Sequence, residues 1–302
     1  MFLLKLKLRS PFPNSPVAMS GMTTKSAEIK KYAVVTGANK GIGLEICRQL
    51  ASQGVSVVLT ARNERRGFEA VEKLKKSGLS DNVMFHQLDV TDLSSVDSLA
   101  AFLKSKIGKL DILVNNAGVN GVRDSEIGGS KNKSDYDLAV ECLQINYYGL
   151  KRTTEGLLPL LQLSDSPRIV NISSTMKSVG SNKRAKDIFN DIGNLSEEKI
   201  DQVLNEYLKD FKEGSLSAKG WPSYWGAYCV SKAAVTAYTR LLAKRHPKML
   251  INSVCPGWVS TDLSSHSGPL STEQGAKSPV RLALLPNGGP SGSFFDQMRA
   301  SS

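Results

Sequence analysis

The chain has 302 residues, of which 40% are hydrophobic and 22% charged, the composition of a soluble globular protein with a large core. No apolar run approaches the roughly 18 residues that a membrane span requires, so we expect no membrane-embedded segment. The net charge of +11 does not indicate nucleic-acid binding, because nearly half of it lies in the first 31 residues. The remainder is scattered, with no basic stretch interleaved with aromatic side chains.

The cysteines and histidines are too widely spaced to indicate a metal site or a disulfide framework. The chain contains Cys47, Cys142, Cys229, Cys255, His86, His246 and His266. The cysteines form no CxxC pair, and no two histidines have the spacing of a ligand pair. We therefore expect no bound metal and no Ser/His/Asp triad. The free thiols suit a reducing intracellular compartment.

Residues 1–28 form a leader that differs from the rest of the chain. The first 27 residues contain no acid, carry three prolines, and alternate leucine with basic residues from Leu4 to Arg9. We expect this basic leader to be disordered. The main expectation is a cytoplasmic protein. The alternatives are a transit peptide for an organelle such as a plastid, or a translation start at Met19 or Met22.

From Tyr32 onward, short apolar runs alternate with amphipathic stretches, which predicts βαβ units and a parallel sheet. We expect one doubly wound α/β domain over residues 29–302. The predicted strands are 32–36, 55–61, 83–88, 111–115, 168–173, 251–255 and 292–295. The predicted helices are 41–53, 63–77, 94–106, 136–162, 225–245 and 272–284. Pro159 should bend or end the fourth helix.

A helix-rich insertion, about residues 175–223, interrupts this alternation. Within it, apolar residues follow helical spacing from Ile200 to Phe211, with acids in the first turn and Gly214 as a stop. The spacing predicts a helix laid against the domain. Its role is either plain packing or contact with a substrate.

A glycine loop, TGANKGIG at residues 36–43, follows the first predicted strand and precedes a helix. Glycines let the backbone turn tightly and approach a pyrophosphate, and the helix N-terminus supplies free N–H groups. The loop therefore predicts a dinucleotide site, although its triplet alone would also suit an ordinary strand-to-helix turn. The candidate contacts are Gly37, Asn39, Lys40, Gly41, Ile42 and Gly43.

Arg62 stands near the end of the second predicted strand, where an acid would bind the ribose of NAD. Its planar guanidinium can pair with a 2′-phosphate, and Lys40 in the glycine loop can add a second positive charge. This arrangement favours NADP(H). The alternative is that Arg62 is a solvated surface side chain.

The next two strands end in polar residues that should face the cleft, because ligands bind at strand carboxyl ends in open α/β sheets. The third strand ends in Asp89 and Val90, and Asp89 could accept a hydrogen bond from an adenine amino group. The fourth ends in Asn115 and Asn116. Asn115 could instead join neighbouring strands through its amide, and both roles remain open.

Tyr228 and Lys232 lie four residues apart in a predicted helix, which places the phenol and the ammonium on one face. A nearby cation favours the ionised phenol, so the pair is a candidate proton donor. The spacing alone is common by chance. A cofactor site upstream is what makes it a candidate catalytic pair.

Taken in order, TGANKGIG, NNAG, the serine pair after VNI, and YCVSK resemble the short-chain dehydrogenase/reductase family over roughly residues 30–296. The long insertion, with KGWPS just before the tyrosine, is similar to the carbonyl reductase branch that includes plant menthone, neomenthol and salutaridine reductases. The resemblance implies a Rossmann domain. It also implies a monomer, because the insertion helix would cover a face that relatives without it use for pairing.

The resemblance further implies catalytic roles for Asn146, Ser174, Tyr228 and Lys232. Ser174 would bond the substrate carbonyl, Tyr228 would donate the proton, and Lys232 would lower the tyrosine pKa and hold the nicotinamide ribose. Asn146 would position a water that relays protons to Lys232. Ser173 is the more structural of the serine pair.

Near the sixth strand, the resemblance places further cofactor contacts at Pro256, Gly257, Val259 and Thr261. Thr261 would contact the nicotinamide carboxamide, or would instead cap a helix that begins before Leu263. Three tryptophans, Trp221, Trp225 and Trp258, could form an apolar wall of the substrate mouth or could be buried packing. The loop 119–135 and the insertion are expected to frame that mouth.

We expect an NADPH-dependent reductase that converts a small ketone or aldehyde, such as a cyclic, terpenoid or alkaloid ketone, to the alcohol in a reversible reaction. The alternative is a protein that binds NADPH as a redox-sensing ligand without turnover. Intact Ser174, Tyr228 and Lys232 favour the enzyme.

Overall fold

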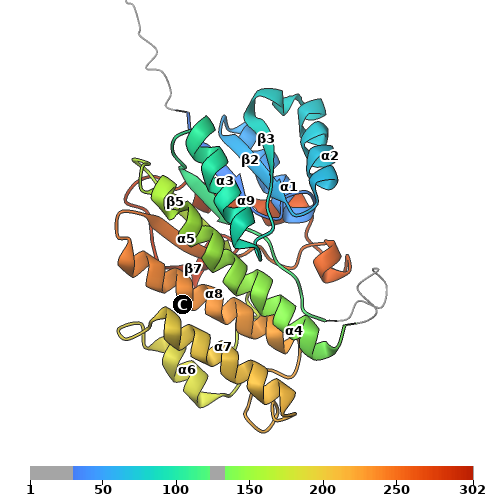
Figure 1. Cartoon of the computed structure of the whole chain (residues 1–302), viewed down its shortest axis with the longest axis vertical. Coiled ribbons are helices and arrows are strands. Elements are labelled where there is room, and N and C mark those ends of the chain that lie inside the picture. Colours follow the sequence, from blue (N-terminus) through green and yellow to red (C-terminus); the bar gives the residue numbers. More distant parts are fainter. Residues whose placement is uncertain (1–29, 123–132, 302) are drawn as a thin grey trace, which may run out of the picture.

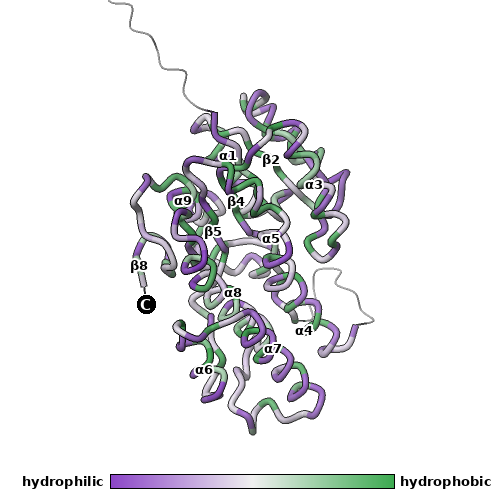
Figure 2. Tube along the Cα trace, turned by 60° about the vertical axis from the view of Figure 1, so that its left-hand side comes forward, coloured by the Kyte–Doolittle hydropathy of each residue, from purple (hydrophilic) through white to green (hydrophobic). Residues whose placement is uncertain are grey.

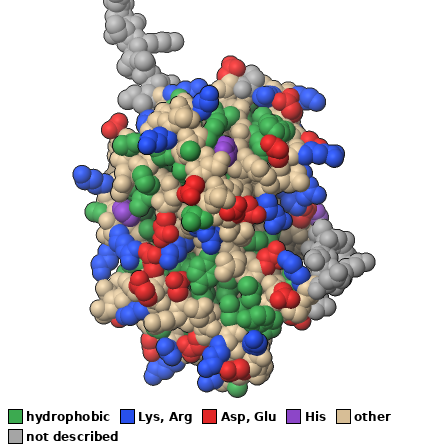
Figure 3. Space-filling view, in the orientation of Figure 1, with side chains coloured by type: hydrophobic (Ala, Val, Ile, Leu, Met, Phe, Trp, Pro, Cys, Tyr) green, Lys and Arg blue, Asp and Glu red, His purple; other side chains and the backbone are tan. Residues whose placement is uncertain are grey.

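A computed structural model describes residues 30–122 and 133–301. The leader and part of the 119–135 loop, whose disorder and role at the substrate mouth were predicted, therefore lie outside the described residues. Within this part of the chain no helix is long and apolar enough to cross a membrane. On the face shown in Figure 3, basic and acidic side chains are interspersed, in line with the scattered charge of the sequence.

The centre of the molecule is one eight-stranded sheet of order β3-β2-β1-β4-β5-β6-β7-β8. The strands are β1 (Tyr32–Val35), β2 (Ser56–Ala61), β3 (Val83–Gln87), β4 (Ile112–Asn115), β5 (Arg168–Ile172), β6 (Leu250–Cys255), β7 (Phe294–Asp296) and β8 (Arg299–Ser301). All pairs are parallel except β7 with β8. The strand order reverses between β1 and β4, and the carboxyl ends of these strands form a crevice there.

The central strands are largely apolar and buried because both of their faces are covered. Every residue of β2, β4, β5 and β6 is buried. Val34 of β1, for example, lies between Val58 and Leu113 of the neighbouring strands. The predicted doubly wound fold and its seven parallel strands are confirmed. The antiparallel β8 was missed, because its three residues are all exposed and carry no apolar signal.

Helices cover both faces of the sheet (Figure 1). The helices are α1 (Gly41–Ser52), α2 (Glu64–Leu74), α3 (Leu93–Lys106), α4 (Asp135–Leu143), α5 (Leu150–Leu161), α6 (Lys183–Asn190), α7 (Glu197–Lys212), α8 (Gly226–Arg245) and α9 (Thr272–Ala283). One apolar core joins the sheet to α1, α2 and α9, and the other joins it to α3, α5 and α8. The crevice at the carboxyl ends of the strands lies between these two layers of helices.

The predicted helix 136–162 is divided. A π-helical turn, Gln144–Gly149, separates α4 from α5. Pro159 lies inside α5, which ends two residues later at Leu161. Such single π turns widen the helix locally and occur often at functional sites. This turn carries Asn146, one of the predicted site residues.

The insertion contains two helices, α6 and α7, at one end of the molecule against α8 (Figure 2). The predicted α7 is confirmed, with Ile200, Val203, Leu204 and Tyr207 buried. Helix α6 was not predicted, because it has only eight residues. Tyr207 packs edge-on against Trp221 at 5.3 Å, and Trp221 Nε1 donates to Asp210 Oδ2 at 2.7 Å. The insertion therefore extends the core that lies on the α8 side of the sheet.

Candidate active site

The glycine loop lies at the carboxyl end of β1 and opens helix α1. Gly37 and Gly41 have φ of 61° and 58°, in the left-handed region that favours glycine. A β-carbon on Gly43 would lie 2.4 Å from Asn116 Nδ2 and 2.8 Å from Gly37 O. The N-cap residue Lys40 makes no side-chain capping bond. The first N–H groups of α1 thus remain open toward the cleft, as an anion site requires.

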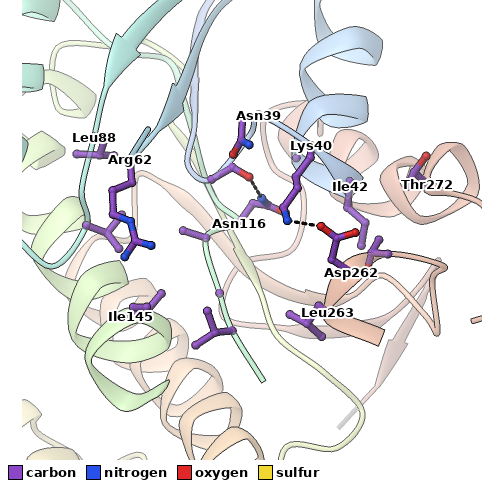
Figure 4. Close-up of a pocket in the computed structure, with 18 of the residues that line it drawn as sticks. Asn39, Lys40, Ile42, Arg62, Leu88, Asn116, Ile145, Asp262, Leu263 and Thr272 are labelled. Carbon is purple, nitrogen blue, oxygen red and sulfur yellow. Dashed lines mark hydrogen bonds and ion pairs between the residues drawn. The ribbon is translucent and has the colours of Figure 1, made fainter. Parts of the chain in front are cut away.

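A cavity of about 460 Å³ extends from this loop along the carboxyl ends of the strands (Figure 4). Most of the predicted cofactor contacts line it: Gly37, Asn39, Lys40, Gly41, Ile42, Gly43, Arg62, Asp89, Val90, Asn116 and Thr261. The glycines admit a ligand close to the backbone. The residues present therefore fit a dinucleotide.

The two predicted phosphate cations lie on different sides of this cavity (Figure 4). Arg62 is exposed beside Leu88, and among the described residues its guanidinium has no carboxylate partner. Lys40 instead forms an ion pair with Asp262, which also lies 3.0 Å from His266 Nε2. The hydrogen bond from Lys40 lowers the pKa of Asp262 below its usual value. Lys40 is therefore paired with a carboxylate at the cavity edge, and both predicted cations line the cavity.

The side chains of the two asparagines at the end of β4 form hydrogen bonds with neighbouring segments of the domain. Asn115 donates through Nδ2 to Thr154 Oγ1 at 3.0 Å and to Asn171 Oδ1 at 2.9 Å, so of its two predicted roles the structure shows the strand-joining one. Asn116 donates to the carbonyls of Thr36 and Gly37 at 2.9 and 3.0 Å, which fixes the glycine loop.

Asp89 lines the cavity, and one of its oxygens accepts from Thr91 N at 2.9 Å and Thr91 Oγ1 at 2.7 Å. That carboxylate oxygen therefore closes a turn. Its partner oxygen remains the candidate acceptor for an adenine amino group.

A second cavity, of about 160 Å³, adjoins the first and shares Ile42, Asn116 and Thr261 with it. It is lined by Ser174, Tyr228, Lys232, Pro256, Gly257 and Val259. Residues predicted from four separate motifs thus meet in one place. Ser173 also lines this cavity, but its hydroxyl is bonded to Thr236 Oγ1 and to the carbonyl of Lys232, the structural role predicted for it.

Lys232 and Tyr228 are both nearly inaccessible to solvent, at 4% and 8% exposure. Lys232 Nζ donates to Ile172 O at 2.7 Å and lies 5.5 Å from the centre of the tyrosine ring. Burial lowers the pKa of Lys232 to about 8, because it disfavours the ammonium.

Burial likewise raises the pKa of Tyr228, and a hydrogen bond with Ser174 offsets only part of this. The predicted lowering of the tyrosine pKa by Lys232 is therefore not seen in the chain alone. Desolvation is the largest cause of the shift in both groups, and the lysine charge is itself disfavoured at this depth.

Asn146 is buried behind the cavity, where its side chain is fully engaged. Its Nδ2 donates to Val119 O at 2.9 Å and to Ser231 Oγ at 3.0 Å, and its Oδ1 accepts from Val119 N at 2.8 Å. The amide therefore anchors the segment that follows β4. A β-carbon on Gly118 would lie 3.2 Å from Asn146 Oδ1 and 3.6 Å from Lys232 Nζ, so glycine brings these groups close together.

Sequence reasoning missed Ser231 as a partner of Asn146. The sequence feature that could have identified Ser231 is its place in YCVSK, one residue before Lys232 on a buried helix. Thr261 caps the short helix Asp262–Ser264, the alternative role predicted for it, while also lining both cavities. Of the three tryptophans, Trp221 is buried in the insertion, whereas Trp225 and Trp258 line the smaller cavity.

Two family models match the chain. One, described as short chain dehydrogenase, matches residues 31–186, and the other, described as Enoyl-(Acyl carrier protein) reductase, matches residues 214–287. Between them they contain the glycine loop, Ser174, Tyr228 and Lys232.

Three known proteins place the chain more closely. It is 55% identical over 291 residues to a (+)-neomenthol dehydrogenase of Arabidopsis thaliana, covering 91% of this chain and 98% of the relative. The solved structure of salutaridine reductase from Papaver somniferum matches with a TM-score of 0.83 and 51% identity, over 88% of this chain and 100% of that one. A carbonyl reductase [NADPH] of Bos taurus is 37% identical over 279 residues, 88% of this chain and 96% of the relative.

Proposed function

The chain belongs to the short-chain dehydrogenase/reductase family, and we propose that it uses NADPH to reduce the carbonyl group of a ketone or aldehyde to the alcohol, reversibly. As a member of this family it is an oxidoreductase that uses a nicotinamide cofactor. The observation that carries the proposal is the meeting of Ser174, Tyr228 and Lys232 in a cavity that adjoins the glycine-loop cavity.

The protein side chains supply orientation and the proton, and NADPH when bound supplies the hydride. Burial keeps the Tyr228 phenol protonated at neutral pH, so it is available as a proton donor to a carbonyl oxygen in the smaller cavity. The Ser174 hydroxyl, which already bonds with Tyr228, can hold the same oxygen. Lys232 places a positive charge beside both when it is protonated, and that charge favours the anion left on the tyrosine.

NADPH, rather than NADH, is the cofactor we propose. The support is the exposed Arg62 guanidinium beside the cavity, together with the carbonyl reductase [NADPH] among the relatives. A planar guanidinium pairs well with the 2′-phosphate that only NADP(H) carries.

Replacing Arg62 by Asp tests this choice. We expect the KM for NADPH to rise by about a factor of ten or more, since a charge-assisted bond is lost and a repulsive charge is added. The KM for NADH should change little. If the ratio of the two KM values stayed as in the wild type, Arg62 would not be a phosphate contact.

A small cyclic ketone, of terpenoid or alkaloid type, is the substrate class we propose, supported by the neomenthol and salutaridine relatives. The protein is further proposed to act as a monomer in which α7 covers α4 and α8. We also propose one catalytic domain over residues 29–302, a basic leader over 1–28, and a cytoplasmic location with an organelle such as a plastid as the alternative.

The central test is NADPH oxidation against a panel of cyclic ketones and quinones by the wild type and by Tyr228→Phe. Loss of the phenolic hydroxyl removes the proton donor, so we expect the rate to fall by roughly 10²- to 10⁴-fold while NADPH still binds. Equally slow turnover by both proteins, with tight NADPH binding, would favour a redox-sensing protein without turnover. The named relatives, which are dehydrogenases and reductases, give that alternative no support.

A further inference from the structure

The smaller cavity opens beside a row of three aromatic side chains, Tyr224, Trp225 and Trp258, called here the aromatic wall. The rings of Tyr224 and Trp225 stack with centres 5.5 Å apart and planes 13° apart. Those of Trp225 and Trp258 lie 6.5 Å and 19° apart. Trp225 also meets the ring of Tyr228 edge-on at 5.5 Å. The wall therefore runs from the proton donor out to the surface.

The wall leaves large aromatic surfaces uncovered. Tyr224 is 63% exposed and Trp258 is 46% exposed, although large apolar side chains are usually buried. Trp225 and Trp258 line the cavity together with Ser174 and Tyr228. A flat apolar group lying in the cavity mouth would cover these faces, and the aromatic stacking would favour it over a puckered group of the same size.

Trp225 is held in a conformation that is unfavourable for a bulky residue. Its φ of 47° and ψ of 43° lie in the left-handed region, where a β-carbon crowds the following carbonyl. Such strain persists only where the surroundings impose it, and it concentrates at functional sites. The residue stands at the N-cap of α8 but makes no side-chain capping bond, so capping does not explain it.

The first turn of α8 imposes this conformation. Cys229 N donates to Trp225 O at 2.9 Å, and Cys229 Sγ donates to Tyr224 O at 3.5 Å. A β-carbon on Gly226 would lie 2.8 Å from the hydroxyl of Tyr207, so the start of α8 is pressed against α7 of the insertion. Tyr224 and Trp225 are thus fixed to the helix that carries Tyr228, and the insertion sets their position.

Trp258 is backed from the other side. A β-carbon on Gly268 would lie 2.6 Å from Trp258 Cδ1, so the 268 turn packs directly on the indole. Leu270 N donates to Trp258 O at 3.2 Å. Both tryptophans are therefore placed before any ligand arrives, which reduces the entropy lost on binding.

We propose that the aromatic wall selects carbonyl substrates whose carbonyl group is fused to a flat aromatic or conjugated ring, by stacking that ring on Trp225 and Trp258. This inference rests on the proposed reductase function. It assigns Tyr224, Trp225 and Trp258 a role in specificity only, while proton transfer remains with Tyr228.

The test compares 1-tetralone, whose carbonyl is fused to a benzene ring, with its saturated bicyclic analogue trans-1-decalone. Trp225→Leu keeps apolar bulk but removes the flat face. We expect kcat/KM for 1-tetralone to fall by about fivefold, the effect of one aromatic contact, and that for 1-decalone by less than twofold. Trp258→Leu, at a position without backbone strain, should likewise lower the ratio of kcat/KM for 1-tetralone to kcat/KM for 1-decalone.

Three further variants separate stacking from damage to the helix. Trp225→Asn tolerates the left-handed backbone and so preserves the start of α8; it should lose the 1-tetralone preference as fully as Trp225→Leu does. Tyr224→Ala should lose about half of it, since that ring stacks behind Trp225. Phe68→Leu alters an exposed ring that lines neither cavity and should leave the ratio unchanged.

Binding separates failure of this inference from failure of the reductase function. Calorimetric titration of the Tyr228→Phe variant with each ketone, with NADPH present, should show about fivefold tighter binding of 1-tetralone, and Trp225→Leu in that background should abolish the difference. If neither ketone were reduced but this difference in affinity remained, the selectivity of the aromatic wall would be supported and the reductase function would be contradicted. The selectivity proposed for the aromatic wall would be wrong if both ketones were reduced and no wall variant changed the ratio of their kcat/KM values or of their affinities. It would also be wrong if the wall variants lowered the activity with both ketones equally.

Discussion

At the glycine-loop end of the cleft the backbone forms the walls, whereas at the Tyr228 end side chains do. Gly37, Gly41 and Gly43 leave room that any side chain would fill, and no side chain of Lys40 caps the start of α1. At the other end Lys232 and Tyr228 are buried and their pKa values are displaced. Binding at the glycine-loop end therefore depends on the shape of the backbone, whereas chemistry at the Tyr228 end depends on the protonation of its side chains.

Gly43→Ala should break the shape-dependent end. The new β-carbon would lie 2.4 Å from Asn116 Nδ2 and 2.8 Å from Gly37 O, which neither backbone nor amide can avoid without moving. Overpacking of this kind costs about 1–3 kcal/mol, so we expect NADPH affinity to fall by roughly 5- to 150-fold. Fluorescence titration with NADPH measures this.

The matched control is Gly54→Ala, at a glycine with nothing within 4 Å of its added β-carbon. That variant should bind NADPH as the wild type does, although its positive φ of 80° should cost some stability. Equal losses of affinity in both variants would mean that general instability, and not the glycine loop, lowers NADPH binding.

The protonation-dependent end should respond to pH. Because burial lowers the pKa of Lys232 to about 8, the ammonium is present below that pH and lost above it. Tyr228, whose pKa is raised, stays protonated over the same range. We expect kcat/KM for ketone reduction to fall with rising pH above about 8, approaching tenfold per unit.

Lys232→Arg provides the control for this pH effect. A guanidinium does not lose its proton in proteins, so the variant should be slower but should lack the fall above pH 8. A fall that persisted unchanged in Lys232→Arg would assign it to another group. A flat wild-type profile between pH 7 and 9 would show that Lys232 is not needed in its charged form.

The same division explains what the sequence could predict. The glycine loop and the buried strands are local patterns, and the Ser174, Tyr228 and Lys232 positions belong to short motifs, so the sequence predicts the fold and part of the lining of both cavities. Strand β8 was missed because Arg299–Ser301 has only three residues, all of them exposed. The π turn Gln144–Gly149 was missed because residues 136–162 were predicted as one continuous helix.

Environment, unlike position, could not be predicted. The spacing of Tyr228 and Lys232 indicated a lowered tyrosine pKa, yet their depth decides the direction, and depth depends on the whole domain. Lys40 was predicted to face a phosphate together with Arg62. It pairs with Asp262, 222 residues away, which no local pattern reveals.

The smallest expected effect concerns that ion pair, at the boundary between the two ends. Both partners are partly exposed, at 59% and 39%, so the pair adds at most about 1 kcal/mol to stability. Asp262→Asn removes a negative charge from the cavity edge and releases Lys40 toward the ligand. We expect NADPH affinity to rise by about two- to threefold, with little change for NADH and a smaller effect at high salt, because exposed charges are screened. Glu69→Gln, at an exposed acid paired with Arg65 away from both cavities, should leave both affinities unchanged. If Asp262→Asn changed NADPH and NADH binding alike, Lys40 would act on the shape of the glycine loop and not on the 2′-phosphate.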